Sequence, residues 1–301
     1  MALGSGVAFG AMAIFGKLAY DEGATVGTLL SIRFALAALM FWAIVFATSA
    51  ARDLKGLGRR DLAIGLGLGA VGYAAQAGCF FSALERIDAG LLSLLLYTFP
   101  AMVAVAAVAL GRERFDARKL IALVLASGGL VLVLAGAGAG KLDPLGVALG
   151  LGAAIVYTTY ILSSQGVSGR MQATLLSALV CTGATVMLTA GSAALGELRP
   201  GDLTPMGWVW LVSIALVSTV AAVGLFFAGL RRVGPTSASI LATVEPLTTV
   251  LLAFLIFGET LGPAQLVGGA LVLSAVIVLQ VRRRPRFAAE PVPLALGEEA
   301  A

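Results

Sequence analysis

The stretch Ile240–Glu259 reads ILATVEPLTTVLLAFLIFGE, and it is apolar over almost its whole length. A helix needs about 20 apolar residues to cross a lipid bilayer, and this stretch is of that length. Near its middle it carries Glu245, which is followed at once by Pro246. A carboxylate inside an apolar span is costly and marks a candidate functional site, and a proline removes a backbone donor and weakens the helix beside it. We therefore expect a membrane-spanning helix with one chemically active group and a bend near its centre.

The composition indicates that the rest of the chain also lies in a membrane. Hydrophobic residues make up 59% of the 301 residues, and charged residues only 12%. A soluble domain needs a charged, mixed surface, and this chain has too few charges to cover one. The sequence contains no histidine, which excludes Ser-His-Asp and Cys-His catalysis and histidine metal sites. We expect a membrane protein that is not an enzyme, with no metal, no cofactor and no nucleic-acid partner.

Apolar runs separated by short polar or Gly/Pro turns recur along the chain. They predict an all-α membrane protein with ten transmembrane helices, at residues 3–20, 26–48, 62–83, 89–111, 117–136, 145–164, 171–192, 206–230, 235–257 and 262–281. The remaining residues, 282–301, are polar and contain three prolines. We expect them to form a disordered cytoplasmic tail.

The basic residues fall mainly on one side of this bundle. The loops and tail on that side carry Arg52, Lys55, Arg59, Arg60, Arg112, Arg114, Arg118, Lys119, Arg170, Arg231, Arg232, Arg282, Arg283, Arg284 and Arg286. The opposite side receives only Arg86, Lys141 and Arg199. Because Lys and Arg are enriched in cytoplasmic loops, this pattern predicts that both termini are cytoplasmic.

The chain also repeats itself. Two segments align without a gap and pair Pro100 with Pro246, Glu113 with Glu259, and Leu120 with Leu266. We therefore divide the chain into a first five-helix repeat, 1–140, and a second, 141–281. Because five is an odd number, the second repeat enters the membrane upside down. Inverted repeats are typical of secondary transporters, which bind substrate near the midplane between the halves.

These features resemble the EamA family of the drug/metabolite transporter superfamily. The resemblance rests on Arg33 in the second helix, Pro100 in the fourth, Glu245-Pro246 in the ninth, and the matched ends LGRE (Leu110–Glu113) and FGE (Phe257–Glu259). It covers the chain up to about residue 281. It implies ten helices, cytoplasmic termini and transport of small metabolites across the bacterial inner membrane, with amino-acid export as the best known activity of bacterial members.

Two buried charges are the strongest candidates for substrate contacts. Glu245 either faces a cavity, where it contacts a substrate amine or titrates, or is a structural carboxylate that accepts a hydrogen bond or caps the helix after Pro246. Arg33 either holds a substrate carboxylate bidentately or ties its helix to the bundle through a structural pair. Arg33 has no counterpart in the second repeat, and Phe99 aligns with Glu245, so these charges break the symmetry between the halves.

Lys17 lies in the last turn of the first helix. It either extends to the lipid headgroups or faces the cavity with Arg33, where two cations would suit an anionic substrate. Small multidrug transporters bind cations with a carboxylate in the first helix. Lys17 is the only charge predicted there, so this chemistry is not supported.

Polar aromatic and amide side chains form a candidate pocket wall, with helix packing as the alternative for each of them. They are Tyr73, Gln76, Tyr97 and Tyr157. Pro100 and Pro246 are candidate hinges of a gate, or else static kinks. These features predict a secondary transporter that exports amino acids or related metabolites by alternating access, as a monomer or a homodimer. The alternative substrates are phosphorylated or sugar-linked metabolites or drugs.

Overall fold

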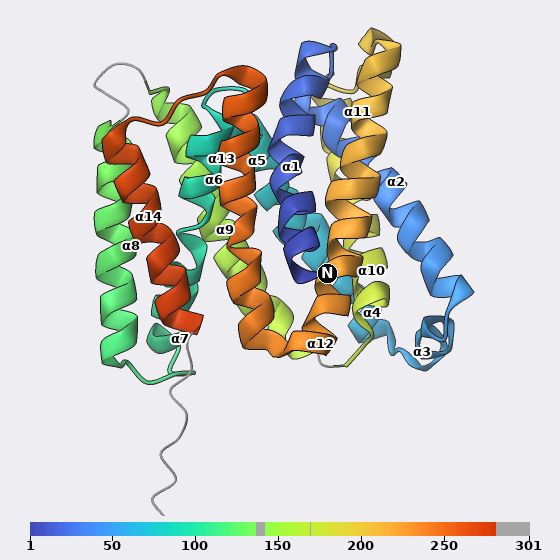
Figure 1. The fold of residues 1–301 in the computed structure, drawn as a ribbon. Helices are drawn as coiled ribbons and strands as arrows, with labels where there is room; N and C mark the ends of the chain where they lie inside the picture. Colours follow the sequence, from blue (N-terminus) through green and yellow to red (C-terminus); the bar gives the residue numbers. More distant parts are fainter. Residues whose placement is uncertain (137–141, 169, 281–301) are drawn as a thin grey trace, which may run out of the picture.

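The computed structural model describes residues 1–136, 142–168 and 170–280, and all regular structure in these ranges is helical (Figure 1). The helices are α1 (Ala2–Asp21), α2 (Val26–Ala47), α3 (Ala50–Gly56), α4 (Arg59–Gly67), α5 (Ala74–Leu84), α6 (Ala89–Leu96), α7 (Phe99–Ala109), α8 (Ala117–Gly136), α9 (Pro144–Ser168), α10 (Ala173–Ala194), α11 (Pro205–Ala215), α12 (Ala222–Ala242), α13 (Val244–Phe257) and α14 (Pro263–Gln280). Two π-helical segments, η1 (Leu68–Tyr73) and η3 (Leu216–Ala221), join α4 to α5 and α11 to α12, and a 3-10 turn, η2 (Pro200–Asp202), precedes α11.

The expected all-helical membrane architecture is confirmed. Within the described ranges, nine helical segments are long and apolar enough to cross a membrane, and Val244–Phe257 is a further, shorter apolar helix. The predicted tail, 282–301, lies outside the described residues, as does Lys141 in the loop between the two predicted repeats.

One predicted pair of helices has different boundaries in the structure. The expected spans 206–230 and 235–257 are replaced by the continuous run α11–η3–α12, which ends at Ala242, and by α13, which begins at Val244. The chain breaks at Thr243, so Pro246 lies in the first turn of α13. A proline is tolerated in that turn because its missing N–H has no partner within the helix. The sequence located the weak point, and the structure resolves it as a helix break instead of a bend.

The first half of the chain has a corresponding break. Helix α6 ends at Leu96, Tyr97 and Thr98 form a turn, and Pro100 lies in the first turn of α7. In the alignment of the two repeats, Tyr97 lies opposite Thr243. Each half therefore carries one broken helix, with its proline on the same side of the break.

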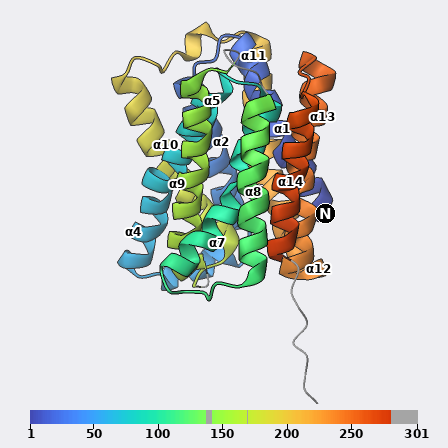
Figure 2. The same ribbon diagram turned by 90° about the vertical axis from the view of Figure 1, so that its left-hand side faces the viewer.

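The two halves interlock through an exchange of packing partners. Helix α1 packs against α11, α12 and α13, whereas α9 packs against α5, α6 and α7. Helix α2 packs along α10, and α8 along α14, a pair that lies side by side in both ribbon views (Figures 1 and 2). Two repeats related by a two-fold axis would produce this exchange, although the inverted orientation of the repeats stays a prediction.

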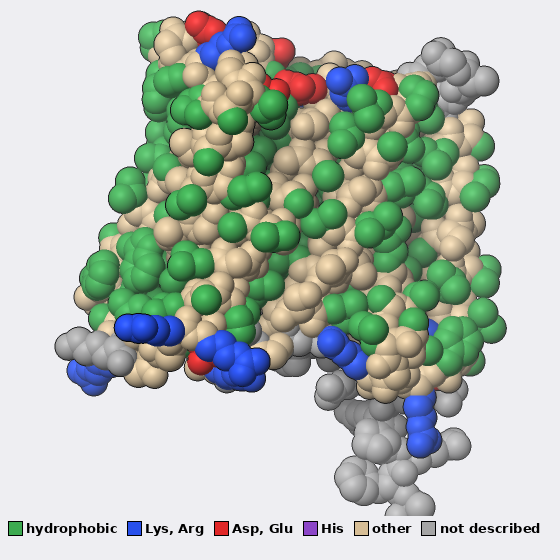
Figure 3. All heavy atoms as spheres, turned by 180° about the vertical axis from the view of Figure 1, so that it is seen from behind, with side chains coloured by type: hydrophobic (Ala, Val, Ile, Leu, Met, Phe, Trp, Pro, Cys, Tyr) green, Lys and Arg blue, Asp and Glu red, His purple; other side chains and the backbone are tan. Residues whose placement is uncertain are grey.

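Charge separates the two ends of the bundle. Lys and Arg side chains gather at the lower end in Figure 3, acidic side chains are frequent at the upper end, and the wall between is largely hydrophobic. The connection from α2 through α3 to α4, and the connection from α7 to α8, both lie at the lower end (Figure 1). We call this the basic end, and we call the opposite end, where α13 is followed by α14, the acidic end.

Candidate functional site

A central cavity of about 350 Å³ lies between the two halves. Seven of the predicted residues line it: Arg33, Tyr73, Gln76, Tyr97, Pro100, Tyr157 and Glu245. The rest of the lining is mainly apolar and includes Phe9 and Met12 of α1, Phe80 of α5 and Phe226 of α12. The cavity therefore combines two opposite formal charges with apolar and aromatic walls, as ligand pockets commonly do.

Arg33 is held firmly on the wall that α2 contributes. Only 1% of its surface is exposed, and its Nε donates a hydrogen bond to Thr219 Oγ1 at 3.0 Å. Its guanidinium carbon lies 4.9 Å from the centre of the Phe34 ring and 5.3 Å from that of Phe81. A guanidinium attracted to aromatic faces is restricted in its motion, so Arg33 is already ordered before any ligand binds.

The π-helical segments bring polar groups to Arg33. Thr219 lies in η3, and its hydroxyl donates to the carbonyl oxygen of Ile214, five residues earlier, at 3.0 Å. That hydroxyl therefore uses its hydrogen within its own helix and its lone pair for Arg33. Tyr73 ends η1, and its ring meets that of Phe34 edge to face at 5.5 Å. Both predicted halves thus contribute a distorted helix near one cation, and π segments are frequent at functional sites.

Glu245 lies in the first turn of α13, where its Oε2 is within hydrogen-bonding distance, 2.9 Å, of the Tyr97 hydroxyl oxygen. The same hydroxyl lies 3.0 Å from the carbonyl oxygen of Ala242. That carbonyl would bond the N–H of residue 246 in an unbroken helix, and Pro246 has none. Tyr97, from the break between α6 and α7, therefore compensates for the break between α12 and α13.

Aromatic rings connect the neighbourhood of Arg33 to that of Glu245. Successive ring centroids lie 4.7 to 6.1 Å apart in the order Phe34, Tyr73, Tyr160, Tyr157, Phe99 and Tyr97. Most neighbours meet edge to face, an arrangement that aromatic pairs prefer. The helices that carry the two charges are thus linked by stiff side chains.

Lys17 does not join Arg33 on the cavity lining. Its ammonium forms an ion pair with Glu259 and lies 5.5 Å from the centre of the Phe257 ring. A lysine one turn from the end of its helix can reach a carboxylate on a neighbouring element. Because the Glu259 side chain is only 9% exposed, pairing with Lys17 compensates a charge that would be costly to leave buried alone. Pro246 is buried and also lies off the lining.

Two residues on or near the cavity were missed by the sequence analysis. Thr219 was one of many threonines in apolar runs, and only the π segment turns it toward Arg33. Gln280 falls inside the expected last span, 262–281, where it was not singled out, but it lines the cavity, and its Oε1 is buried without a hydrogen-bond partner among the described residues. A buried unsatisfied acceptor beside a cavity marks a place where a ligand or a water can donate a hydrogen bond.

The family is decided by a model described as the EamA-like transporter family, which matches residues 1–135 and 144–281. The chain belongs to this family. EamA-like proteins are transporters, so the chain is a membrane transporter and not an enzyme, as its composition predicts.

Curated relatives of this EamA-like chain are also named as transporters. An uncharacterized transporter of Archaeoglobus fulgidus is 30% identical over 226 residues, which are 75% of this chain and 78% of that protein. The uncharacterized transporter YcbK of Bacillus subtilis is 26% identical over 283 residues, or 92% of this chain and 90% of that protein. The threonine/homoserine exporter RhtA of Escherichia coli is 26% identical over 230 residues, or 74% of this chain and 72% of that protein.

A solved structure supports the fold of this EamA-like chain. A protein known from its crystal structure superposes with a TM-score of 0.63 over 92% of this chain and 95% of its own length, at 16% sequence identity. At that identity the likeness concerns the fold alone.

Proposed function

We propose that this chain is a secondary transporter that exports amino acids or related small metabolites across the bacterial inner membrane by alternating access. The observation that carries the proposal is that Arg33 and Glu245 both line the same cavity. A zwitterion needs one group of each sign, and both of these groups are costly to bury inside a membrane, which points to a functional role for each. The relative RhtA, which is named as a threonine/homoserine exporter, supports the same class of substrate.

The chemistry of binding follows from the lining. The Arg33 guanidinium presents N–H groups that match a carboxylate in a bidentate arrangement. The substrate ammonium has acceptors in the Glu245 carboxylate and in Gln280 Oε1, and the substrate side chain lies against Met12 and Phe80. A cavity of about 350 Å³ falls at the lower end of the range for small-molecule sites, which suits an amino acid.

A phosphorylated or sugar-linked metabolite fits this site less well. That alternative depended on two cations in the cavity, and Lys17 is paired with Glu259 instead. Arg33 is left as the one cation on the described lining, and Glu245 would repel a phosphate whenever it is ionised. The geometry therefore favours a substrate with both an amine and a carboxylate.

A set of polar contacts joins the helix ends at the acidic end. The Glu259 carboxylate forms an ion pair with the Lys17 ammonium, and its Oε2 accepts a hydrogen bond from the backbone N–H of Gly90 at 3.2 Å. It thereby joins the end of α1 and the start of α6 to the loop after α13. Burial and the neighbouring Glu259 carboxylate raise the pKa of Asp88, and Lys17 acts against them. We call the Lys17–Glu259–Gly90 contacts the acidic-end latch.

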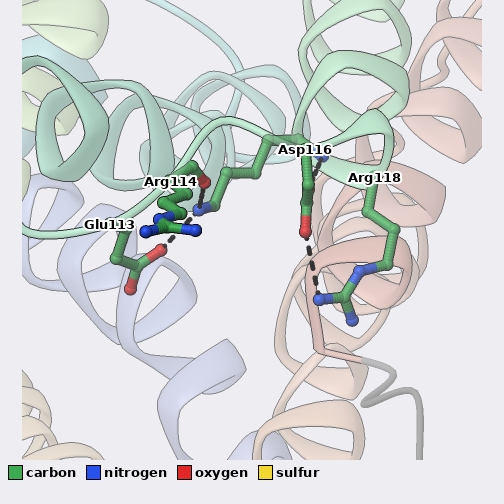
Figure 4. A network of polar contacts seen from close by, with 5 residues as sticks. Glu113, Arg114, Asp116 and Arg118 are labelled. Atoms are coloured by element: carbon green, nitrogen blue, oxygen red, sulfur yellow. Dashed lines mark hydrogen bonds and ion pairs between the residues drawn. The ribbon is translucent and has the colours of Figure 1, made fainter.

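At the basic end, a second cavity of about 420 Å³ shares Phe99 and Pro100 with the central one and extends to the loop between α7 and α8. Charged side chains of this loop pair locally: Lys119 with Glu113 at 2.9 Å, and Arg118 with Asp116 at 3.3 Å (Figure 4). Glu113 is 56% exposed, whereas Glu259, its counterpart in the aligned repeat, is 9% exposed.

This asymmetry supports alternating access between inverted repeats. In the proposed cycle the structure represents a state that faces the basic end, and in the opposite state Glu113 becomes buried while Glu259 is released. The excess of Lys and Arg supports a cytoplasmic location for the basic end and for both termini. The transporter works as a monomer or as a homodimer in lipid.

The proposed activity has a direct test. Vesicles that contain the purified protein and are preloaded with labelled amino acids are expected to release them faster than protein-free vesicles, with clear preferences across a panel of amino acids. The reason for selectivity is the fixed apolar and aromatic lining around the two charges. Equal release rates with and without the protein, for every amino acid in the panel, would show that the proposed substrate class is wrong.

The acidic-end latch gives a second prediction. In a background with Cys79 and Cys181 replaced by alanine, Met12→Cys places a reporter thiol on the cavity wall. Lys17→Ala is expected to raise the reaction rate of this thiol with an impermeant maleimide added at the acidic end. If the lost contact shifts the equilibrium by about 1.4 kcal/mol, the rise is about tenfold.

The control for this prediction is the corresponding change at the other end, Lys119→Ala, which should not raise labelling from the acidic end. Exchanging the charges with Lys17→Glu and Glu259→Lys is expected to restore slow labelling in part, because the ion pair is rebuilt but a lysine at position 259 cannot accept the Gly90 N–H. Labelling that is unchanged by Lys17→Ala would contradict the latch.

A further inference from the structure

The Tyr97 hydroxyl has more acceptors around it than it has hydrogens. It lies 2.9 Å from Glu245 Oε2 and 3.0 Å from the carbonyl oxygen of Ala242. A tyrosine hydroxyl carries a single hydrogen, together with lone pairs that can accept. An ionised carboxylate and a carbonyl oxygen are both acceptors only, so one of the two contacts would then place two acceptors together without a hydrogen between them.

A proton on Glu245 resolves this shortage. The Glu245 carboxylic acid then donates to the Tyr97 oxygen, and the Tyr97 hydroxyl donates to the Ala242 carbonyl, so that both contacts are hydrogen bonds of ordinary length. We propose that Glu245 is the proton-binding site of this transporter: it holds a proton in the observed conformation and releases it when substrate binds. This inference rests on the proposed export function, because it identifies the ion whose movement drives export.

The surroundings of Glu245 are consistent with a neutral acid. The titratable and charged groups that face it are Tyr97 from the α6–α7 break, Tyr73 from η1, Tyr157 from α9, and Arg33 from α2 on the same cavity lining. Among the described residues, no Lys or Arg forms an ion pair with it. A carboxyl group in an apolar setting, bonded to a tyrosine and not to a cation, favours its protonated form.

Helix α1 contributes close backbone contact to Glu245 instead of charge. A Cβ at Gly10 would lie 2.6 Å from the carbonyl oxygen of Glu245, and one at Gly6 would lie 3.4 Å from its backbone N. The charge of α1 at Lys17 is engaged by Glu259 at the acidic end. Close approach of α1 therefore excludes water from the backbone side of the α12–α13 break and leaves the carboxyl group to face the cavity.

The proton and the substrate compete for the same group. When substrate enters, Glu245 gives its proton to water in the cavity, and the resulting carboxylate accepts a hydrogen bond from the substrate ammonium while Arg33 holds the substrate carboxylate. After the protein opens to the other side and the substrate leaves, the carboxylate takes a proton from water there. One proton enters for each substrate exported, and charge and atoms balance at each step. Glu245 thus serves both the amine and the proton, at different points of the cycle.

Proton release also acts on the helix breaks. Once Glu245 is ionised, the Tyr97 hydroxyl donates to the carboxylate, and the Ala242 carbonyl loses its donor at the α12–α13 break. Ala242 is half-buried on the cavity lining, and a carbonyl there that loses its donor favours a rearrangement at that break, because an unpaired carbonyl away from water costs about 1–3 kcal/mol. Tyr97 itself lies in the α6–α7 break, so a single hydroxyl links the ionisation of Glu245 to both broken helices.

The first test measures the proton without reference to transport. The infrared difference spectrum between the wild-type protein and Glu245→Gln, without substrate at neutral pH, is expected to contain the carbonyl stretch of a protonated carboxylic acid, with the shift on transfer to deuterated water that identifies it. Adding a transported amino acid should convert that band to carboxylate bands. Carboxylate bands in the substrate-free difference spectrum would overturn the proposal.

The second test separates proton coupling from transport itself. With saturating substrate on both sides, Glu245→Gln is expected to slow substrate exchange, because the substrate ammonium loses its charged partner, and to make the remaining exchange independent of pH. Accumulation driven by an imposed pH gradient should fall to the level that the same variant reaches without a gradient. Glu197→Gln, which changes an exposed carboxylate in the loop before η2, is the control and should retain both activities.

The outcomes of the second test are distinguishable. Wild-type exchange without any gradient-driven accumulation would refute the proton site and leave the export function standing. Absence of exchange in the wild-type protein would refute the export function, and the infrared spectrum would still decide whether Glu245 is protonated. Gradient-driven accumulation by Glu245→Gln would refute the proton site.

Discussion

Replacement of Arg33 by leucine is expected to abolish transport of every substrate that carries a carboxylate. The guanidinium is 1% exposed, is fixed by Thr219 and lies against two aromatic rings, so it offers a pre-ordered partner for the substrate. Removal of one partner of a buried, hydrogen-bonded charge pair costs about 2–5 kcal/mol. Because 1.4 kcal/mol corresponds to a tenfold change, substrate affinity should fall by about 30-fold to several thousandfold.

The same variant separates a binding role for Arg33 from a structural one. Replacing a buried ion by an apolar residue is often neutral or stabilising when the ion is not part of an essential pair. If Arg33 binds substrate, the Arg33→Leu protein should unfold at an unchanged or higher temperature without substrate, and it should lose the rise in unfolding temperature that substrate gives the wild-type protein. A large drop in unfolding temperature without substrate would instead identify Arg33 as a structural tie.

Two further variants complete this experiment. Arg33→Lys keeps the charge but lacks the planar fork that matches a carboxylate, so weakened transport is expected instead of none. Arg199→Leu removes an exposed arginine at the acidic end, outside the cavity lining, and should leave transport unchanged. Equal loss in Arg33→Leu and Arg199→Leu would point to a general effect of charge removal.

The polar residues of the cavity were predictable from the sequence because a polar side chain is costly inside a membrane. Polar groups in apolar runs concentrate where they can find partners or water, and for that reason Arg33, Gln76 and Glu245 all line the cavity. The prolines located the helix breaks for an equally local reason, since the missing N–H affects only the preceding turn.

The remaining features depend on relations between distant segments. Lys17 and Glu259 pair across almost the whole chain, and no local pattern indicates which carboxylate a lysine meets. Thr219 reaches Arg33 because the wide π turns of η3 change the direction in which its side chain points. An apolar run in the sequence gives no sign of such a turn. The inverted relation of the two halves stays a prediction from the repeat, and the exchange of helix partners supports it.

Replacement of Gly183 by alanine is expected to destabilise the fold more than any other single methyl addition in α10. A Cβ at Gly183 would lie 2.1 Å from the carbonyl oxygen of Leu66 and 2.9 Å from the backbone N of Ala70. The contact is reciprocal, because a Cβ at Gly69 would lie 2.0 Å from the carbonyl oxygen of Val180. Membrane helices use glycines for such close approach of backbones, and at this crossing neither side has a flexible side chain that can move away.

Since backbone must move, the expected loss exceeds the usual 1–3 kcal/mol or so for overpacking in a core, and it should appear as a clear drop in the unfolding temperature of the purified protein in detergent. Gly191, in the same helix, has nothing within 4 Å of its ideal Cβ. Gly191→Ala should therefore be neutral or stabilising by up to about 1 kcal/mol, the difference in helix propensity. Because η1 carries Tyr73 beside Arg33, Gly183→Ala should also weaken substrate binding in the protein that remains folded. Similar unfolding temperatures for the two variants would mean that α10 and η1 do not meet backbone to backbone.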